Sequence, residues 1–108
     1  MAEIFKKEIV QRITRNLLDI QILRLIQPEP MWGYKIKKQA ETNFGVTLRH
    51  GALYPLLSRL EKESFITGQK QKQGGRTRKV YSITQKGQNY LQAYYNVLQE
   101  QMSRKDVE

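Results

Sequence analysis

Cysteine is absent from this sequence of 108 residues. Disulfide bonds and thiolate metal sites are therefore excluded, and a cytoplasmic location becomes the default, because disulfides belong to oxidising compartments. The sequence also lacks any run of eighteen apolar residues, so neither a membrane-spanning helix nor a membrane partner is expected. Residues 1–16 mix acidic and basic side chains without a continuous apolar block, which argues against a secretory signal.

Side chains that carry out enzyme chemistry are few. The chain has one histidine, His50, and two aspartates, Asp19 and Asp106, which fall in a predicted helix and in the C-terminal tail. Glu61 and Glu63 lie on neighbouring faces of one predicted helix, so they are not an opposed acid–base pair, and no serine has a nearby base. The sequence shows neither a phosphate-binding glycine loop nor a metal-ligand spacing. We therefore expect a protein that is not an enzyme and that has no metal site and no cofactor.

Acidic residues are missing from one long segment. The formal net charge is +9, and residues 64–99 contain no aspartate or glutamate. The cations of this segment are Lys70, Lys72, Arg76, Arg78, Lys79 and Lys86. A localised cationic strip is typical of a protein with a polyanionic partner, because each neutralised phosphate releases counterions. The strip favours nucleic acid as the partner; the alternative is a basic protein that its charge keeps soluble.

Apolar residues, by contrast, are regularly spaced. They recur at helical spacing from Ile4 to Ile26, which predicts an amphipathic helix whose second half is buried more completely than its first. Pro28 and Pro30 end this helix. Residues 33–44 predict a second helix, which Gly45 is well placed to stop, and residues 46–48 are too few for more than a turn or a brief strand.

A third helix and a hairpin follow. The third helix is predicted within residues 49–66 from leucines at spacing i, i+3, i+4 and i+7, which are Leu53, Leu56, Leu57 and Leu60. Residues 65–71 and 78–84 favour strands, and the Gly74–Gly75 pair between them predicts a hairpin turn. Thr84 is a suitable N-cap for a last helix.

The order helix, helix, helix, hairpin, helix predicts a mainly α fold with a small β-hairpin. This is the layout of a winged helix-turn-helix followed by a C-terminal helix. We expect a single domain over residues 1–108, with an N-terminal helix extension at 1–16, the winged-helix core at 17–84 and a dimerisation helix at 85–103.

In a helix-turn-helix the third helix places its N-terminal part in the major groove of DNA and packs its other face into the core. Double-stranded DNA is therefore the expected partner. The predicted contacts outside the hairpin are Lys35, Arg49, His50, Tyr54, Ser58 and Arg59, and those on the hairpin are Lys70, Lys72, Arg76, Arg78 and Lys79. Whether Arg49 or Arg59 reads a guanine or holds a phosphate is left open. The alternative is an ordinary amphipathic helix with a solvated face, which does not explain the basic hairpin.

The two ends of the chain carry apolar stripes that a core of this size leaves uncovered. These stripes consist of Ile4, Phe5, Ile9 and Ile13 near the N-terminus and of Leu91, Tyr94, Tyr95, Leu98 and Met102 near the C-terminus. Because soluble monomers avoid exposed apolar stripes, we expect mutual packing across a two-fold axis in a homodimer. The alternative is that the two stripes pack on each other within one chain.

Three motifs resemble the PadR family of transcriptional regulators. They are "GYKI" (33–36), "GALYPLLSRLEKESFI" (51–66) and "GGRTRKVYSITQKGQNYL" (74–91), and the similarity runs from about Leu17 to Leu91. The resemblance implies a homodimeric winged-helix repressor that binds a pseudo-palindromic operator. It also implies that Tyr34, Tyr54 and the hairpin cations contact DNA or shape that surface. Short members of the family have one C-terminal helix, which forms the dimer interface.

The sequence departs from the family pattern at three places. Ser64 stands where the family usually has glycine after the third helix, and Arg49-His50 replaces a commoner small residue followed by proline. Trp32, the only tryptophan, precedes the Gly-Tyr turn, whereas some short relatives have a tryptophan on the last helix that stacks flat drugs between protomers. That helix here offers tyrosines, for which interface packing is the favoured role and a pocket for a small aromatic effector the alternative.

Two rivals to a sequence-specific repressor follow from the same residues. One is an architectural protein that binds DNA without regard to sequence. The other is a winged helix that serves as a protein-interaction module, in which case the hairpin cations make no phosphate contact.

Overall fold

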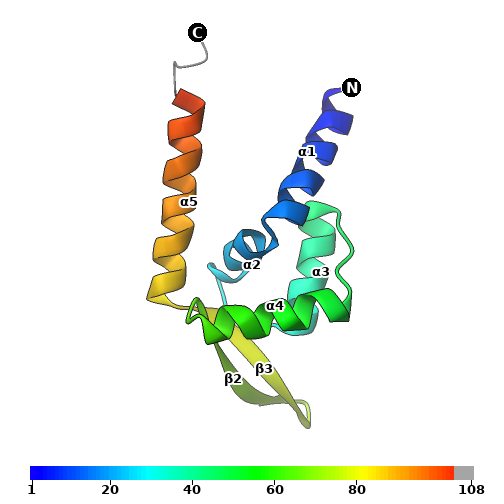
Figure 1. Cartoon of the computed structure of the whole chain (residues 1–108). Helices are drawn as coiled ribbons and strands as arrows, with labels where there is room; N and C mark the ends of the chain where they lie inside the picture. Colours follow the sequence, from blue (N-terminus) through cyan, green and yellow to red (C-terminus); the bar gives the residue numbers. More distant parts are fainter. Residues whose placement is uncertain (104–108) are drawn as a thin grey trace.

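The computed structural model describes residues 1–103, which form five helices and one small antiparallel sheet (Figure 1). The elements are α1 (Ala2–Asn16), α2 (Leu18–Ile26), β1 (Met31–Trp32), α3 (Gly33–Phe44), α4 (His50–Lys62), β2 (Ile66–Gln73), β3 (Arg76–Ile83) and α5 (Gln85–Ser103). Helices α2, α3 and α4 surround the core, the β2–β3 hairpin extends from one end of it, and α1 and α5 project from the other (Figure 1). The winged helix-turn-helix with a C-terminal helix is confirmed.

The single helix predicted over residues 4–26 was wrong, because the chain bends between α1 and α2. Leu17 leaves the helical conformation with φ −127° and ψ 47°. The bend turns the second half of the apolar stripe into the core, where Ile22 and Leu23 are completely buried. It leaves the first half outside, with Ile9 55% exposed. The expectation that the second half is the more buried one is confirmed.

A chain of hydrogen bonds fixes this bend. The amide of Gln21 donates to the hydroxyl of Thr14 over 3.0 Å, and that hydroxyl donates to the carbonyl of Val10 over 2.8 Å. The guanidinium of Arg24 donates to the amide oxygen of Gln21 over 2.8 Å. Thr14 and Gln21 are both buried, and each buried polar atom of the two side chains has a partner. Because buried polar groups are costly when unpaired, this chain defines one angle between α1 and α2.

The sheet has the strand order β1-β3-β2. The hairpin of β2 and β3, here called the wing, is paired in register from Ile66 opposite Ile83 to Gln73 opposite Arg76. Gly74 and Gly75 close it with φ angles of 57° and 80°, as the predicted two-residue turn requires. Strand β1 was not predicted, because its two residues between Pro30 and α3 are too few to show an alternating pattern.

The start of α5 is tied to the end of α4. Thr84 is the predicted N-cap: its hydroxyl accepts a hydrogen bond from the Gly87 N–H over 3.0 Å. The Phe65 carbonyl accepts the Thr84 N–H over 3.1 Å, and Gly87 lies so close to it that a Cβ atom there would overlap the carbonyl oxygen. Ser64 precedes this joint with φ 66°, the left-handed conformation that glycine adopts without strain.

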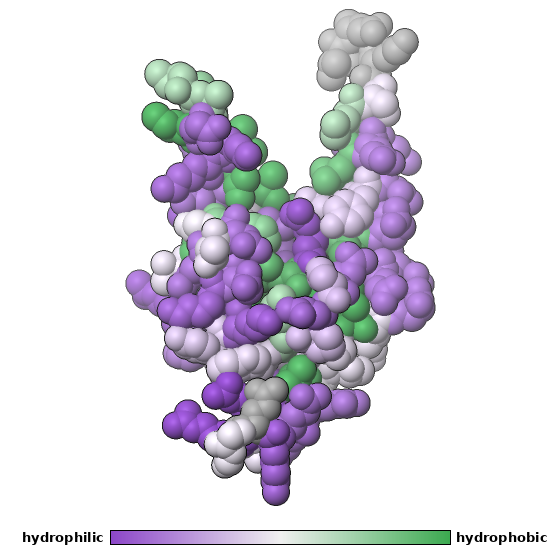
Figure 2. Space-filling view, turned by 180° about the vertical axis from the view of Figure 1, so that it is seen from behind, coloured by the Kyte–Doolittle hydropathy of each residue, from purple (hydrophilic) through white to green (hydrophobic). Residues whose placement is uncertain are grey.

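The described chain measures 59 × 32 × 22 Å, and α1 and α5 account for much of its length. The space-filling view shows them as two separate projections with apolar atoms on both, opposite a hydrophilic wing (Figure 2). Within residues 1–103, no helix combines the length and hydropathy needed to cross a membrane.

Candidate nucleic-acid interface

Helix α4 has one buried and one exposed face. Leu53, Leu57 and Leu60 are buried in the core, as the spacing predicted. The exposed face carries the predicted contact residues Arg49, His50, Tyr54, Ser58 and Arg59. Arg49 is the residue before the first turn, so the cation lies at the N-terminal end of the helix. This is the end that enters the major groove in a helix-turn-helix.

Pro55 lies inside α4, five residues after His50. It cannot donate the backbone hydrogen bond that the Gly51 carbonyl would otherwise accept. Both residues are exposed, so water can bind this carbonyl while the buried leucines remain packed. The proline therefore lies on the face of α4 where a missing backbone donor costs least.

Aromatic side chains extend from α4 toward the wing. The rings of His50 and Tyr54 are stacked with centroids 5.4 Å apart. The Tyr54 ring packs against Gly33, where a Cβ atom would lie 2.7 Å from the tyrosine oxygen. The rings of Trp32 and Tyr34 lie 5.4 Å apart on either side of that glycine. We call His50, Tyr54, Trp32 and Tyr34 the aromatic strip.

The cations of the wing differ in how their side chains are packed. Lys70, Lys72 and Arg76 are exposed, and within residues 1–103 none of them forms an ion pair. Arg78 is half-buried, with its Cζ atom 3.6 Å from the centre of the Trp32 ring. The first three are therefore exposed charges without a carboxylate partner, whereas Arg78 packs on a ring.

Lys79 differs from the other wing cations because it has a carboxylate partner. Its Nζ atom lies 2.7 Å from Glu61 Oε1, and this hydrogen bond raises the pKa of Lys79 above its ordinary value. The second oxygen of Glu61 accepts the Gly68 N–H over 3.2 Å. Glu61 therefore holds both strands of the wing against α4. This role of Glu61 could not be predicted from the sequence, because residues 61 and 79 are brought together only by the register of the hairpin.

Two other predicted cations also have partners. The Nζ atom of Lys35 lies 2.9 Å from Glu29 Oε1, and the Nε atom of Arg59 lies 3.3 Å from Glu63 Oε1. All four side chains are at least 40% exposed, so these pairs are weak and a phosphate can replace the carboxylate.

The predicted interface residues at the chain ends are mostly exposed. Ile4, Phe5 and Ile9 are each more than half exposed, Ile13 is 36% exposed, and Leu98 and Met102 are 40% and 85% exposed. Tyr94 and Tyr95 are half-buried. Leu91 requires a correction: it is fully buried in its own core and has no surface to offer a partner.

A groove of about 400 Å³ separates α1 from α5. Its walls include Ile13 from α1 and Tyr94, Tyr95 and Leu98 from α5. A second, more apolar pocket lies on another side of α5, against Leu17. The residues of α5 that line this second pocket are Tyr90, Ala93, Tyr94 and Val97, and three of them were not predicted to be interface residues. Their i, i+3, i+4, i+7 spacing was visible in the sequence.

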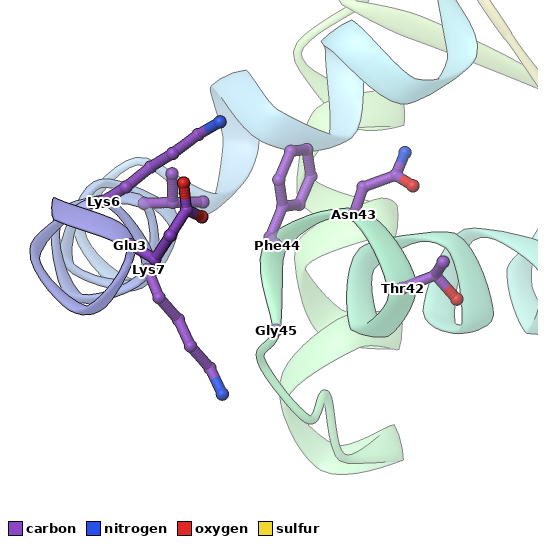
Figure 3. Close-up of a pocket in the computed structure, with 8 residues that line it drawn as sticks. Glu3, Lys6, Lys7, Thr42, Asn43, Phe44 and Gly45 are labelled. Atoms are coloured by element: carbon purple, nitrogen blue, oxygen red, sulfur yellow. The ribbon is translucent and has the colours of Figure 1, made fainter. Parts of the chain in front are cut away.

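A third pocket, of about 280 Å³, lies between the start of α1 and the end of α3 (Figure 3). Lys6 and Lys7 extend from α1, and Phe44 faces them from α3. Nearby, the amide of Gln11 donates to the Gly45 carbonyl over 2.9 Å. None of the predicted DNA contacts lines this pocket, which therefore lies outside the candidate interface.

Comparison with known proteins agrees with this geometry. The family model described as the transcriptional regulator PadR-like family matches residues 22–93, more than half of the chain. This chain belongs to the PadR-like family. The match includes α3, α4 and the wing, so the resemblance seen in the sequence is confirmed.

Several structures and one sequence are similar to this PadR-like chain. A transcriptional regulator from Clostridium thermocellum has a TM-score of 0.70 and 26% identity, over 90% of this chain and 99% of that one. Bacillus subtilis PadR in complex with operator DNA has a TM-score of 0.68 and 29% identity, over 73% of this chain and 46% of that one. An uncharacterized protein of Lysinibacillus sphaericus is 37% identical over 73% of this chain and 75% of its own length.

Proposed function

We propose that this chain is a sequence-specific DNA-binding repressor that acts as a homodimer on a pseudo-palindromic operator. The observation that carries the proposal is the exposed polar face of α4 beside wing cations that have no carboxylate partner among residues 1–103. The N-terminal part of α4 enters a major groove, while the wing follows the adjacent phosphates. The structure of Bacillus subtilis PadR with operator DNA supports this proposal by analogy.

A selection experiment tests the proposal. The purified chain is mixed with a library of duplexes that carry a randomised central segment, and bound DNA is recovered and sequenced over several rounds. We expect an inverted repeat whose half-sites lie about 10 base pairs apart, centre to centre. Binding to the selected duplex should exceed binding to a random duplex by about 1,000-fold or more at physiological salt.

The two rival functions predict other outcomes. A chain that binds every duplex with equal affinity is an architectural DNA-binding protein. A chain that binds no duplex, even at low salt where phosphate contacts are strongest, is a protein-interaction module. Repression is then tested by placing the selected site in front of a reporter gene, where expression should fall when the protein is produced.

Dimerisation through α1 and α5 is part of the proposal. The alternative that the two apolar stripes cover each other within one chain finds no support, because a groove separates the helices. Ile4, Phe5 and Ile9 of α1 stay exposed, and so do Leu98 and Met102 of α5. A second copy that brings α5 against α1 would cover them. The groove, with Phe44, Tyr94 and Tyr95 in its wall, is also where a small aromatic effector would bind.

Substitution of Leu98 with glutamate should weaken the dimer. An unpaired carboxylate buried in an apolar interface costs roughly 3 kcal/mol or more, so we expect the dimer Kd to rise about 100-fold. Sedimentation velocity over a concentration series measures this. The matched control is Gln99→Glu, which adds the same charge to the neighbouring exposed position and should leave the dimer intact. A wild-type chain that remains monomeric at high micromolar concentration would contradict the dimer.

A further inference from the structure

Trp32 occupies a junction between the sheet and the helices. It is the last residue of β1, opposite Val80 of β3, and it immediately precedes the first residue of α3. Directly opposed residues of an antiparallel pair point to the same face, and residue j−2 on that face lies within reach of a long side chain. Trp32, Val80 and Arg78 therefore share one face of the sheet. The chain has no other tryptophan.

Arg78 lies on the indole ring. Its Cζ atom is 3.6 Å from the ring centre, a distance that fits contact through the flat face of the guanidinium. An N–H group aimed at the ring would hold Cζ farther away. The five N–H donors of arginine lie in the guanidinium plane, so a group held through its face keeps them available to an acceptor.

No acceptor within the described chain uses these donors. Among the side chains that the structure describes, Arg78 has neither an ion pair nor a hydrogen-bond partner, whereas Lys79 beside it is bound to Glu61. An arginine that is held by a ring and has free donors is prepared to donate two parallel hydrogen bonds to a pair of anionic oxygens, such as those of a phosphate. Fixing the side chain in advance also reduces the rotamer entropy that binding would cost.

The position of the pair suits a phosphate between the wing and α4. Trp32, Gly33, Tyr54 and Arg78 border a shallow pocket of about 170 Å³ at this place. Through Gly33 and Tyr54, the aromatic strip continues from Trp32 to His50 in the first turn of α4. Gly33, with the Trp32 and Tyr34 rings beside it and the Tyr54 ring packed against it, thus lies between Arg78 on the wing and the recognition end of α4, so the two can meet DNA as one unit.

We infer that Trp32 is a positioning residue for DNA binding: its ring holds the Arg78 guanidinium toward a phosphate between the wing and α4. This inference rests on the proposed function. Trp32 itself does not contact the DNA. It contributes to DNA affinity only by positioning Arg78. That separates it from a residue that only stabilises the fold and from one that contacts DNA directly.

A double-mutant cycle tests the inference. The affinities of wild type, Trp32→Leu, Arg78→Gln and the double variant are measured by fluorescence anisotropy on the duplex selected by the wild type. We expect Kd to rise about 5-fold for Trp32→Leu and about 10-fold for Arg78→Gln, but no more than about 10-fold for the double variant. The salt slope of Arg78→Gln should fall by about one.

Two matched variants serve as controls. Lys72→Gln removes a wing charge that does not pack on an aromatic ring. In that background Trp32→Leu should still raise the Kd for DNA about 5-fold, as it does in the wild type. Trp32→Phe retains a ring face for the guanidinium and should recover most of the affinity. Thermal unfolding of each variant separates a binding effect from a loss of folded protein.

The emission of Trp32 gives a second measurement that needs no DNA. Arg78→Gln should change the emission of the free protein, because the cation over the ring is removed. Unchanged emission overturns the stacked arrangement in solution. Effects of Trp32→Leu and Arg78→Gln that multiply in the double variant overturn the positioning role. If the wild type selects no duplex, the proposed sequence-specific DNA binding is wrong. That result is distinct from a failure of the positioning role.

Discussion

Replacing Gly87 with alanine should lower the free energy of unfolding by about 3 kcal/mol, at the upper end of the usual cost of overpacking. The added Cβ would overlap the Phe65 carbonyl oxygen, which belongs to the backbone and is held by the N–H of Thr84. Neither side can move without breaking the joint between α4 and α5. Chemical denaturation followed by circular dichroism measures the change.

Gly51 provides the control for Gly87. It also lies in a helix, but a Cβ atom there meets nothing within 4 Å. Gly51→Ala should therefore raise the free energy of unfolding by roughly 0.5–1 kcal/mol, since alanine favours the helical backbone over glycine. If the two alanine variants were equally stable, the close approach of α5 to Phe65 would not exist in solution.

Removal of three exposed cations of the wing that have no carboxylate partner among residues 1–103 should cause the largest loss of DNA affinity. The variant Lys70→Gln, Lys72→Gln, Arg76→Gln retains Glu61, Lys79 and the Trp32–Arg78 contact, so the fold of the wing is kept. Loss of three phosphate contacts should weaken binding about 100-fold at physiological salt and reduce the slope of log K against log salt by about three. Anisotropy titrations of the selected duplex over a salt series measure both quantities.

A control variant with the same change in net charge separates the effect of local phosphate contacts from the effect of net charge on DNA affinity. Lys6, Lys7 and Arg12 are exposed on α1, the helix that projects from the core on the side opposite the wing (Figure 1). Their replacement with glutamine lowers the net charge equally but should change the salt slope by far less than three. Equal slopes for the two triple variants would show that the wing makes no local phosphate contacts.

Local signals in the sequence predicted most of the fold. Gly45 ends α3 with φ 66°, the Gly74–Gly75 pair turns the wing, and Thr84 caps α5. Each of these depends on a residue whose conformational preference acts within a few positions of the chain. The leucine spacing of α4 likewise identified its buried face, because helical periodicity maps directly onto a side of the helix.

Features that depend on distant segments were missed. The bend at Leu17 interrupts a stripe that looks continuous, since the break serves the packing of α2 and no glycine or proline marks it. Glu61 and Lys79 meet only through the hairpin register, and Trp32 meets Arg78 only because β1 pairs with β3. Leu91 was assigned to an interface because the sequence shows that a residue is apolar but not which surface covers it.

The bend between α1 and α2 has a consequence for the spacing of operator half-sites that the proposed dimer can bind. Its angle is fixed inside each chain by Thr14 and Gln21, which are buried and are not among the predicted DNA contacts. In the proposed dimer α1 forms part of the joint between copies, so this angle sets how far apart the two α4 helices lie. Two relatives with identical α4 sequences but different bends would then require different half-site spacings. The angle between α1 and α2 would then determine the spacing of the operator half-sites, whereas the residues of α4 would determine their base sequence.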